Sequence, residues 1–208
     1  MVVALAGALP AAGGPLAVGS SQYVVQPDPR LCPSPRCGGY WVGLANRRLT
    51  RCHDGTLRAR CYVAVAVDEQ RDGLESAVPA DALVRAALET RSFGNLGELG
   101  VLVVADIRAP TGQERNGVVY RVRDLGVRCV RAPCFSLRAA RVNGSSRTTV
   151  SDLDLRPAIS TQDQRVQAER ALATPAGLFV TGRIAPSTDG GRVLRAWRVY
   201  LRVGPPRG

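Results

Sequence analysis

The sequence predicts a mainly β fold with minor helix (α+β), organised as two tandem copies of a small antiparallel β unit. One observation is a set of four anchor residues that recurs 97 positions later: Tyr23, Cys32, Cys37 and Asn46, then Tyr120, Cys129, Cys134 and Asn143. Another is a block farther along, in which residues 100–107 (GVLVVADI) match residues 177–184 (GLFVTGRI) at an offset of 77. Two matched blocks in the same order predict a duplicated unit.

The duplication divides the 208-residue chain into units of a size typical of small domains. We place the first β-rich repeat unit at residues 22–112 and the second at residues 117–204. The polar, turn-rich stretch around residues 110–117 is the boundary between them. Residues 1–20 precede both units and form a signal peptide or a flexible arm.

In the first unit we expect four strands and one helix: strands at 23–25, 40–46, 61–67 and 101–107, and a helix at 81–89. The helix prediction depends on Asp81 as the N-cap and on an apolar spacing that is typical of one helical face.

In the second unit we expect five strands and one helix: strands at 118–123, 135–142, 148–155, 178–184 and 193–203, and a helix at 161–173. Alternation along the first of these strands turns Val118, Tyr120 and Val122 inward and Arg121 and Arg123 outward. This order of elements is compatible with small barrels resembling the OB fold, or with twisted antiparallel sheets that each have one helix packed on a face.

The six cysteines are predicted to form three local disulfides: Cys32–Cys37, Cys52–Cys61 and Cys129–Cys134. The second unit has only two cysteines, which must pair with each other if each unit folds alone. The equivalent two cysteines of the first unit then pair as well, and the last two are left for each other. The competing hypothesis is a zinc site, but the second unit offers no further ligand beside its cysteine pair. We therefore expect disulfides and no metal.

His53 is the single histidine of the chain and lies beside Asp54 in a predicted turn. A Ser-His-Asp or Cys-His catalytic device would have to use it, yet the sequence contains no nucleophile-elbow motif. Asp152 and Asp154 share one face of a predicted strand, a two-carboxylate cation signal that lacks a surrounding Gly/Asp-rich loop. We expect neither a catalytic site nor a cofactor.

The candidate binding residues lie in and beside the two Cys-x4-Cys loops: Arg36, Tyr40, Trp41 and Arg131. Prolines and a disulfide stiffen the loop around Arg36, and a stiff loop loses little entropy on binding. Tyr40, Trp41 and Trp197 occur at strand spacing, which favours packing in the core over a platform for a sugar.

All 28 basic residues are arginine, and with 17 acidic residues they give a net charge of +11. Arginine binds carboxylate and phosphate groups with bidentate geometry, so the candidate partners are anionic envelope or extracellular polymers, besides a protein partner. The arginines form no run and no single helical stripe, which equally fits codon bias over a solvated surface. We do not expect nucleic acid as a partner.

Residues 1–20 carry no charge, and their apolar run is too short and too broken by Gly and Pro to span a bilayer. Residues 17–19 (AVG) form a small-x-small motif typical of a signal cleavage site. No other segment has the length and hydropathy of a transmembrane span. Together with the cysteines, this predicts a secreted or periplasmic protein.

Two groups of residues carry a resemblance to a known family: residues 37–40 (CGGY), 50–55 (TRCHDG) and 61–63 (CYV) with Asn46, and residues 126–134 (GVRCVRAPC) with Asn143. They resemble an uncharacterised family of secreted bacterial proteins, a domain of unknown function with paired C-x4-C motifs. The resemblance covers residues 23–184 and implies no activity, ligand or catalytic residue. The cysteine spacing is also similar to that of Kazal-type protease inhibitors, although their six-cysteine framework is absent.

We expect an exported, non-catalytic, disulfide-stabilised binding or structural module, and not an enzyme. The alternative hypothesis is a protease inhibitor that presents the constrained loop around Arg36 to a trypsin-like pocket. A hydrolase would depend on His53 and is the least supported of the three hypotheses.

Overall fold

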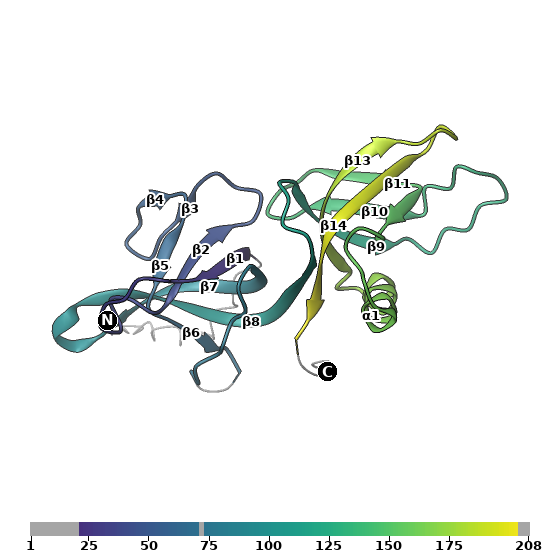
Figure 1. Ribbon diagram of the computed structural model, residues 1–208. Helices are drawn as coiled ribbons and strands as arrows, with labels where there is room; N and C mark the ends of the chain where they lie inside the picture. The colour runs from purple at the N-terminus through teal and green to yellow at the C-terminus, as the bar shows by residue number, and fades with distance from the viewer. Residues whose placement is uncertain (1–20, 71–72, 204–208) are drawn as a thin grey trace, which may run out of the picture.

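The computed structural model describes residues 21–70 and 73–203, so the signal peptide or arm predicted at residues 1–20 lies outside the described residues. The described residues form a sheet of 12 strands, a separate two-stranded ribbon, one α-helix and a short 3-10 turn (Figure 1). The mainly β class is confirmed. The sheet of the described residues is antiparallel for the most part and is not a closed barrel, so the prediction of a small OB-like barrel in each unit is not confirmed.

The first half of the chain contains eight strands and the 3-10 turn η1: β1 (Gln22–Pro27), β2 (Tyr40–Leu44), β3 (Thr50–Arg51), β4 (Leu57–Arg58), β5 (Cys61–Val63), β6 (Val65–Asp68), β7 (Ala82–Ser92), η1 (Gly94–Leu96) and β8 (Glu98–Gly112). Its strand order is β5-β2-β1-β7-β8, with β6 parallel to β8. The strands β3 and β4 pair only with each other.

The second half contains six strands and the helix: β9 (Val118–Asp124), β10 (Leu137–Arg141), β11 (Arg147–Val150), β12 (Asp152–Asp154), α1 (Gln162–Ala173), β13 (Leu178–Pro186) and β14 (Arg192–Arg202). Its strand order is β11-β10-β9-β13-β14, with β12 parallel to β14. The two halves therefore have the same strand order, in which β1 corresponds to β9, β7 to β13 and β8 to β14. Irregularities also fall at matching places, between Arg85 and Ala86 in β7 and between Thr181 and Gly182 in β13.

The 97-residue repeat of the sequence agrees with this matching, but the second block match at an offset of 77 does not. Residues 100–107 lie in β8, whereas residues 178–184 lie in β13, which takes the place of β7 in the strand order. Both segments are buried strands, and buried strands share a Val-rich composition whatever their position in the fold.

The helix predicted at residues 81–89 is wrong, since this segment is the central strand β7 between β1 and β8. Val84 faces the core of the first half, whereas the neighbouring Leu83 faces the contact between the halves. A strand buried on both faces reads as a continuous apolar run, and such a run also contains helical spacings. Within the described residues, the expected helix per unit is therefore present only in the second half.

The helix predicted at residues 161–173 is confirmed as α1. Thr161 accepts a hydrogen bond from the Gln164 amide, and the Gln164 side chain accepts one from the Thr161 amide, which forms a capping box. With 12 residues, α1 is far shorter than the roughly 20 residues that a bilayer-spanning helix requires, and no helix of the described chain meets that requirement.

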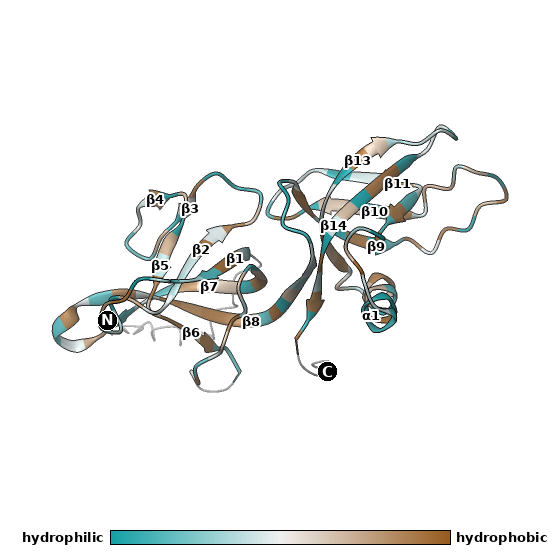
Figure 2. Cartoon of the chain, in the orientation of Figure 1, coloured by the Kyte–Doolittle hydropathy of each residue, from teal (hydrophilic) through white to brown (hydrophobic). Residues whose placement is uncertain are grey.

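Each half has its own apolar core. The first core gathers side chains from β1, β2, β5, β7 and β8, and Figure 2 shows the apolar colouring of β8 where it crosses this half. The second core lies between α1 and one face of the second half of the sheet, and its largest fully buried side chains are Leu178 and Leu194. The opposite face of that part of the sheet is not covered by α1.

The two halves meet along one antiparallel contact between β8 and β14, which we call the seam. Five residue pairs form it, with Pro110 opposite Tyr200 at its centre. A small apolar cluster reinforces the contact with side chains from both halves: Ala45, Leu83, Val119, Val142, Phe179 and Tyr200. The seam makes one continuous sheet from the two halves (Figure 1).

Two asparagines, one in each half, form equivalent hydrogen bonds to the backbone of the opposite half. The Asn46 side chain donates to the carbonyls of Val119 and Val142, at 2.7 and 3.0 Å, and accepts from the Val119 amide at 2.8 Å. The Asn143 side chain makes the same three bonds to the first half: it donates to the carbonyls of Gln22 and Ala45 and accepts from the Gln22 amide.

Both asparagines have left-handed backbone, with φ of 61° at Asn46 and 52° at Asn143. Asparagine tolerates this conformation better than most residues, and its short amide can both donate and accept. The two asparagines of the sequence repeat are therefore among the residues that join the halves.

Charged side chains add to the seam. Asp106 of β8 accepts a hydrogen bond from Arg108 of its own strand and one from Arg202 of β14, both at 2.8 Å. The Arg108 guanidinium lies over the ring of Phe179, 4.6 Å from its centroid. Because Asp106 and Arg108 are buried, their pairing satisfies charges that would otherwise be costly to bury.

Replacing Asn46 with glycine should lower the free energy of unfolding by about 1–3 kcal/mol. Glycine keeps the left-handed backbone but removes all three side-chain bonds and leaves backbone groups of the second half without partners. Urea unfolding measures the change, with the exposed Asn95→Gly in η1 as the control for added backbone flexibility. Equal losses in the two variants would contradict a stabilising role for the bonds across the seam.

Candidate functional site

The three disulfides of the structure are the predicted ones, Cys32–Cys37, Cys52–Cys61 and Cys129–Cys134, with Cα–Cα distances of 5.3, 5.3 and 5.6 Å. Cys52–Cys61 is buried in the first core, where it links the β3–β4 ribbon to β5. The two Cys-x4-Cys disulfides close the loops that follow β1 and β9.

The first Cys-x4-Cys loop is held by a compact polar cluster around Asp28. The Asp28 carboxylate accepts hydrogen bonds from the side chain and amide of Arg30 and from the indole of Trp41. The Arg30 guanidinium lies 5.0 Å from the ring centroids of both Trp41 and Tyr62, and it also donates to the carbonyl of Arg36. The hydrogen bond from Arg30 lowers the pKa of Asp28 to about 2, with smaller contributions from the Arg30 amide and the indole.

The candidate binding residues Arg36, Tyr40, Trp41 and Arg131 do not form one site. Pro27 of β1 pairs with Tyr40 of β2 at the end of the hairpin away from the seam, so the loop with Arg36 is at that far end. The loop with Arg131 follows the far end of β9 in the other half, at the right of Figure 1. Both arginines are exposed, whereas Tyr40 packs against the first core.

His53 lies against Gly100 at the start of β8. Its carbonyl accepts a hydrogen bond from Thr90, and its ring lies so close to Gly100 that a Cβ there would be 2.8 Å from the ring. The neighbouring Asp54 carboxylate accepts from the Thr56 hydroxyl and amide, which lowers its pKa. The buried Nδ1 of His53 has no hydrogen-bond partner among the described residues.

Asp152 and Asp154 are both in β12. The Arg156 guanidinium binds Asp154 through two hydrogen bonds of 2.8 and 2.9 Å and lowers the pKa of its carboxyl. Asp152 accepts from the Leu153 amide. Within residues 21–70 and 73–203, no group of three or more His, Cys, Asp or Glu side chains could hold a metal ion.

The uncovered face of the second half carries a set of arginines that we call the arginine face: Arg121, Arg123, Arg138 and Arg147. Strand register puts them together, because Arg121 and Arg147 both lie opposite Ala140, from the two sides of β10. Arg123 lies directly opposite Arg138 in the next row of the same face. The predicted outward direction of Arg121 and Arg123 is confirmed, since Val122 between them is fully buried in the second core.

Two like charges directly opposite each other destabilise a sheet, and neighbouring strands are only ~4.8 Å apart. None of the four arginines has an ion-pair partner among the described residues. A surface that concentrates uncompensated guanidinium groups in this way attracts anions.

A cavity of about 580 Å³, the arginine groove, begins on this face and reaches the first half at Gln22, Leu44 and Arg47. Its walls include Arg47 of the first half together with Arg121, Arg141 and Arg147 of the second. Among the residues that the structure describes, no acidic side chain lines it. Arg141 also donates to the carbonyl of Asn46, so the inner end of the groove adjoins the asparagine contact.

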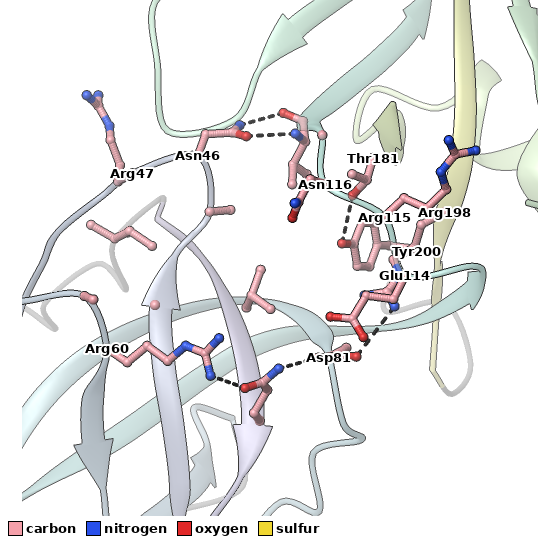
Figure 3. A pocket seen from close by; sticks show the side chains of 18 of the residues that line it. Asn46, Arg47, Arg60, Asp81, Glu114, Arg115, Asn116, Thr181, Arg198 and Tyr200 are labelled. Carbon is pink, nitrogen blue, oxygen red and sulfur yellow. Dashed lines mark hydrogen bonds and ion pairs between the residues drawn. The ribbon is translucent and has the colours of Figure 1, made fainter. Parts of the chain in front are cut away.

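A second cavity, the seam pocket, has a volume of about 320 Å³ and is lined by both halves and by the connecting residues 114–117 (Figure 3). A chain of polar contacts crosses it: Arg60 donates to Gln26, Gln26 donates to Asp81 at 2.9 Å, and Asp81 forms an ion pair with Arg198 at 3.6 Å. Asp81 has left-handed backbone, with φ of 57°.

Sequence reasoning missed both cavities, although it named some residues beside them. The alternation in residues 118–123 indicated two outward arginines. That Arg138 and Arg147 join them follows only from the pairing of β9, β10 and β11, which no pattern in the sequence encodes. Trp41 is in the wall of the seam pocket and also holds the Asp28 cluster.

Residues 21–206 match the family model described as a domain of unknown function (DUF6748). The match covers most of the chain, so the protein belongs to this family. No curated protein and no solved structure matches the chain.

Acid should selectively weaken the Asp28 cluster. The pKa of Asp28 is about 2 in the fold and ~3.9 in an unfolded chain, so the carboxylate stabilises the fold fully above about pH 4. That contribution is lost as the pH falls through about 2. The stability difference between the wild type and Asp28→Asn, measured by urea unfolding from pH 6 to pH 2, should therefore shrink toward zero.

Glu98→Gln, at an exposed strand end, is the matched control and should change stability little at any pH. A difference between wild type and Asp28→Asn that stays constant down to pH 2 would show that the carboxylate does not anchor the loop.

Proposed function

We propose that the protein is an exported, non-catalytic, disulfide-stabilised module that binds an anionic polymer on its arginine face. The observation that carries the proposal is the direct juxtaposition of Arg123 and Arg138, with Arg121 and Arg147 in the adjacent row and no carboxylate of the described residues paired with any of them. A repulsive cluster of this kind is stabilised when anionic groups bind to it.

The shape of the surface favours an extended partner. The four arginines lie on three adjacent strands of one sheet, β9, β10 and β11, and the arginine groove continues them toward Arg47 across the seam. A polymer with regularly spaced anionic groups can contact several arginines at once, and each additional contact is then intramolecular. A single small anion would use only part of this surface.

Three disulfides within a chain of 208 residues support export, because disulfides persist in oxidising compartments. The proposed location is secreted or periplasmic. We also propose that the halves are two tandem copies of one unit, on the grounds of the 97-residue repeat and the shared strand order.

A second candidate function is protease inhibition by the loop around Arg36. In its favour, Arg36 is exposed on a loop held by a disulfide, by Arg30 and by the hydrogen bond from Tyr62 to the Pro35 carbonyl at 2.8 Å. Against it, the Arg36 amide donates to the Pro33 carbonyl, which closes a turn, and the Arg36 carbonyl is already bound. Proteases bind extended chains, so we rank this candidate second.

The proposed function predicts salt-sensitive binding to carboxylated or sulfated polymers that depends on the arginine face. Arg121→Gln with Arg138→Gln should weaken binding at least tenfold, at roughly 1 kcal/mol or fivefold per arginine. The double variant Arg51→Gln with Arg165→Gln removes the same charge from exposed positions elsewhere and is the matched control. Titration calorimetry at low and at physiological salt measures the affinity of both double variants and of the wild type for the polymer.

Equal weakening in the two double variants would leave only a net-charge effect and would contradict a specific arginine face. The absence of binding to any polyanion at low salt would contradict the proposed function itself.

The inhibitor candidate predicts that the wild type slows trypsin cleavage of a small substrate and that Arg36→Ala does not. Arg131→Ala, in the second Cys-x4-Cys loop, is the matched control and should leave inhibition unchanged. A wild type without inhibition at micromolar concentration eliminates this candidate.

A further inference from the structure

The seam pocket is separate from the arginine groove but adjoins it, because both cavities have Leu44 and Arg47 in their walls. A chain-like ligand on the arginine face can therefore continue past Arg47 into the seam pocket. We propose that the seam pocket binds one acidic sugar residue of an anionic polysaccharide whose neighbouring units lie on the arginine face. This inference rests on the proposed function and names its ligand class.

Arg198 is the group in the pocket that most clearly requires an acceptor. Its side chain is only 12% exposed, and its one polar contact among the described residues is the 3.6 Å ion pair with Asp81. Its Nε is buried and has no hydrogen-bond partner. A guanidinium has five N–H donors, and leaving them unsatisfied in a buried position is costly. A carboxylate in the pocket can accept from the part of the Arg198 side chain that is exposed.

Besides its arginines and Asp81, the pocket has polar groups that suit hydroxyls. The hydroxyls of Tyr200 and Thr181 are 3.0 Å apart and share one hydrogen bond, which leaves acceptor capacity on both. Asn116 and Glu114 come from the connecting residues and extend toward the same space in Figure 3. Amide, hydroxyl and carboxylate groups side by side are what a sugar ring with several hydroxyls can satisfy.

Glu114 favours a sugar over a polymer of phosphates, because its carboxylate accepts a hydrogen bond from a sugar hydroxyl, whereas an ionised phosphate chain has no hydroxyl to donate. Trp41 adds an apolar surface to the wall, which a sugar ring can contact and a polyphosphate chain cannot.

The size of the pocket fits a single ring. Its volume of about 320 Å³ is at the lower end of the range of 300–1,000 Å³ that is typical of small-molecule sites. The arginine groove is larger, at about 580 Å³, and its lining contains arginines but no acidic side chain. The two cavities thus bind different parts of the polymer: the groove binds its repeated anionic groups, and the seam pocket binds one sugar ring.

The experiment compares three probes on the intact chain: a hexamer of galacturonate, polyphosphate of similar charge, and a neutral glucose hexamer. The test variant is Asn116→Ala, on exposed connecting residues where folding is not at risk, with Arg198→Gln as a second variant. Asn95→Ala is the matched control. We expect the galacturonate hexamer to bind more tightly than the other two, and Asn116→Ala to weaken it about threefold to tenfold without changing polyphosphate binding.

Each other outcome is decisive. If both polyanions bind and require Arg121 and Arg138, but neither pocket variant affects the galacturonate hexamer, the inference is overturned and the proposed function stands. If polyphosphate binds more tightly and responds to Asn116→Ala, the pocket accepts phosphate and the sugar assignment is wrong. If no polyanion binds, the proposed function and the inference fall together.

Discussion

The structure depends on the antiparallel pairing of β8 with β14, because this contact is what joins two separately cored halves into one sheet. Five backbone pairs at one edge would be a modest contact on their own. The fold adds three further kinds of interaction to the same place: an apolar cluster, the Asp106 network and the bonds made by Asn46 and Asn143. Both proposed binding cavities adjoin these contacts, so the geometry of the seam sets the geometry of the sites.

The local features of the fold were predictable from sequence, and the long-range ones were not. The pairing of all six cysteines follows from the 97-residue repeat and the independence of the units, and the helix expected at residues 161–173 is α1. The helix prediction for the segment from Ala82 was wrong because its apolar side chains pack into two different clusters, one on each face of β7. Hydrophobic periodicity identifies a strand when one of its faces is buried and the other is solvated, whereas both faces of β7 are buried near Leu83 and Val84.

For the candidate site, too, the sequence indicated single residues but not which of them lie together in the fold. The repeat singled out Asn46 and Asn143 as anchors, but only the fold shows that each binds the backbone of the opposite half. The halves differ where a partner would bind. At the first-half positions 97 residues before Arg121, Arg123 and Arg138 are Val24, Gln26 and Trp41. The arginine face therefore belongs to the second half alone. The equivalent uncharged residues of the first half, Val24, Gln26 and Trp41, line the seam pocket instead.

The most direct test of the account is amide hydrogen exchange of the intact protein with and without the galacturonate hexamer. Binding along the arginine face and in the seam pocket should add protection in β9, β10 and β11, in residues 44–47 and in residues 114–117, and should leave exchange unchanged in α1 and in the two Cys-x4-Cys loops. Protection confined to the loops around Arg36 or Arg131, with none along the seam, would contradict the account.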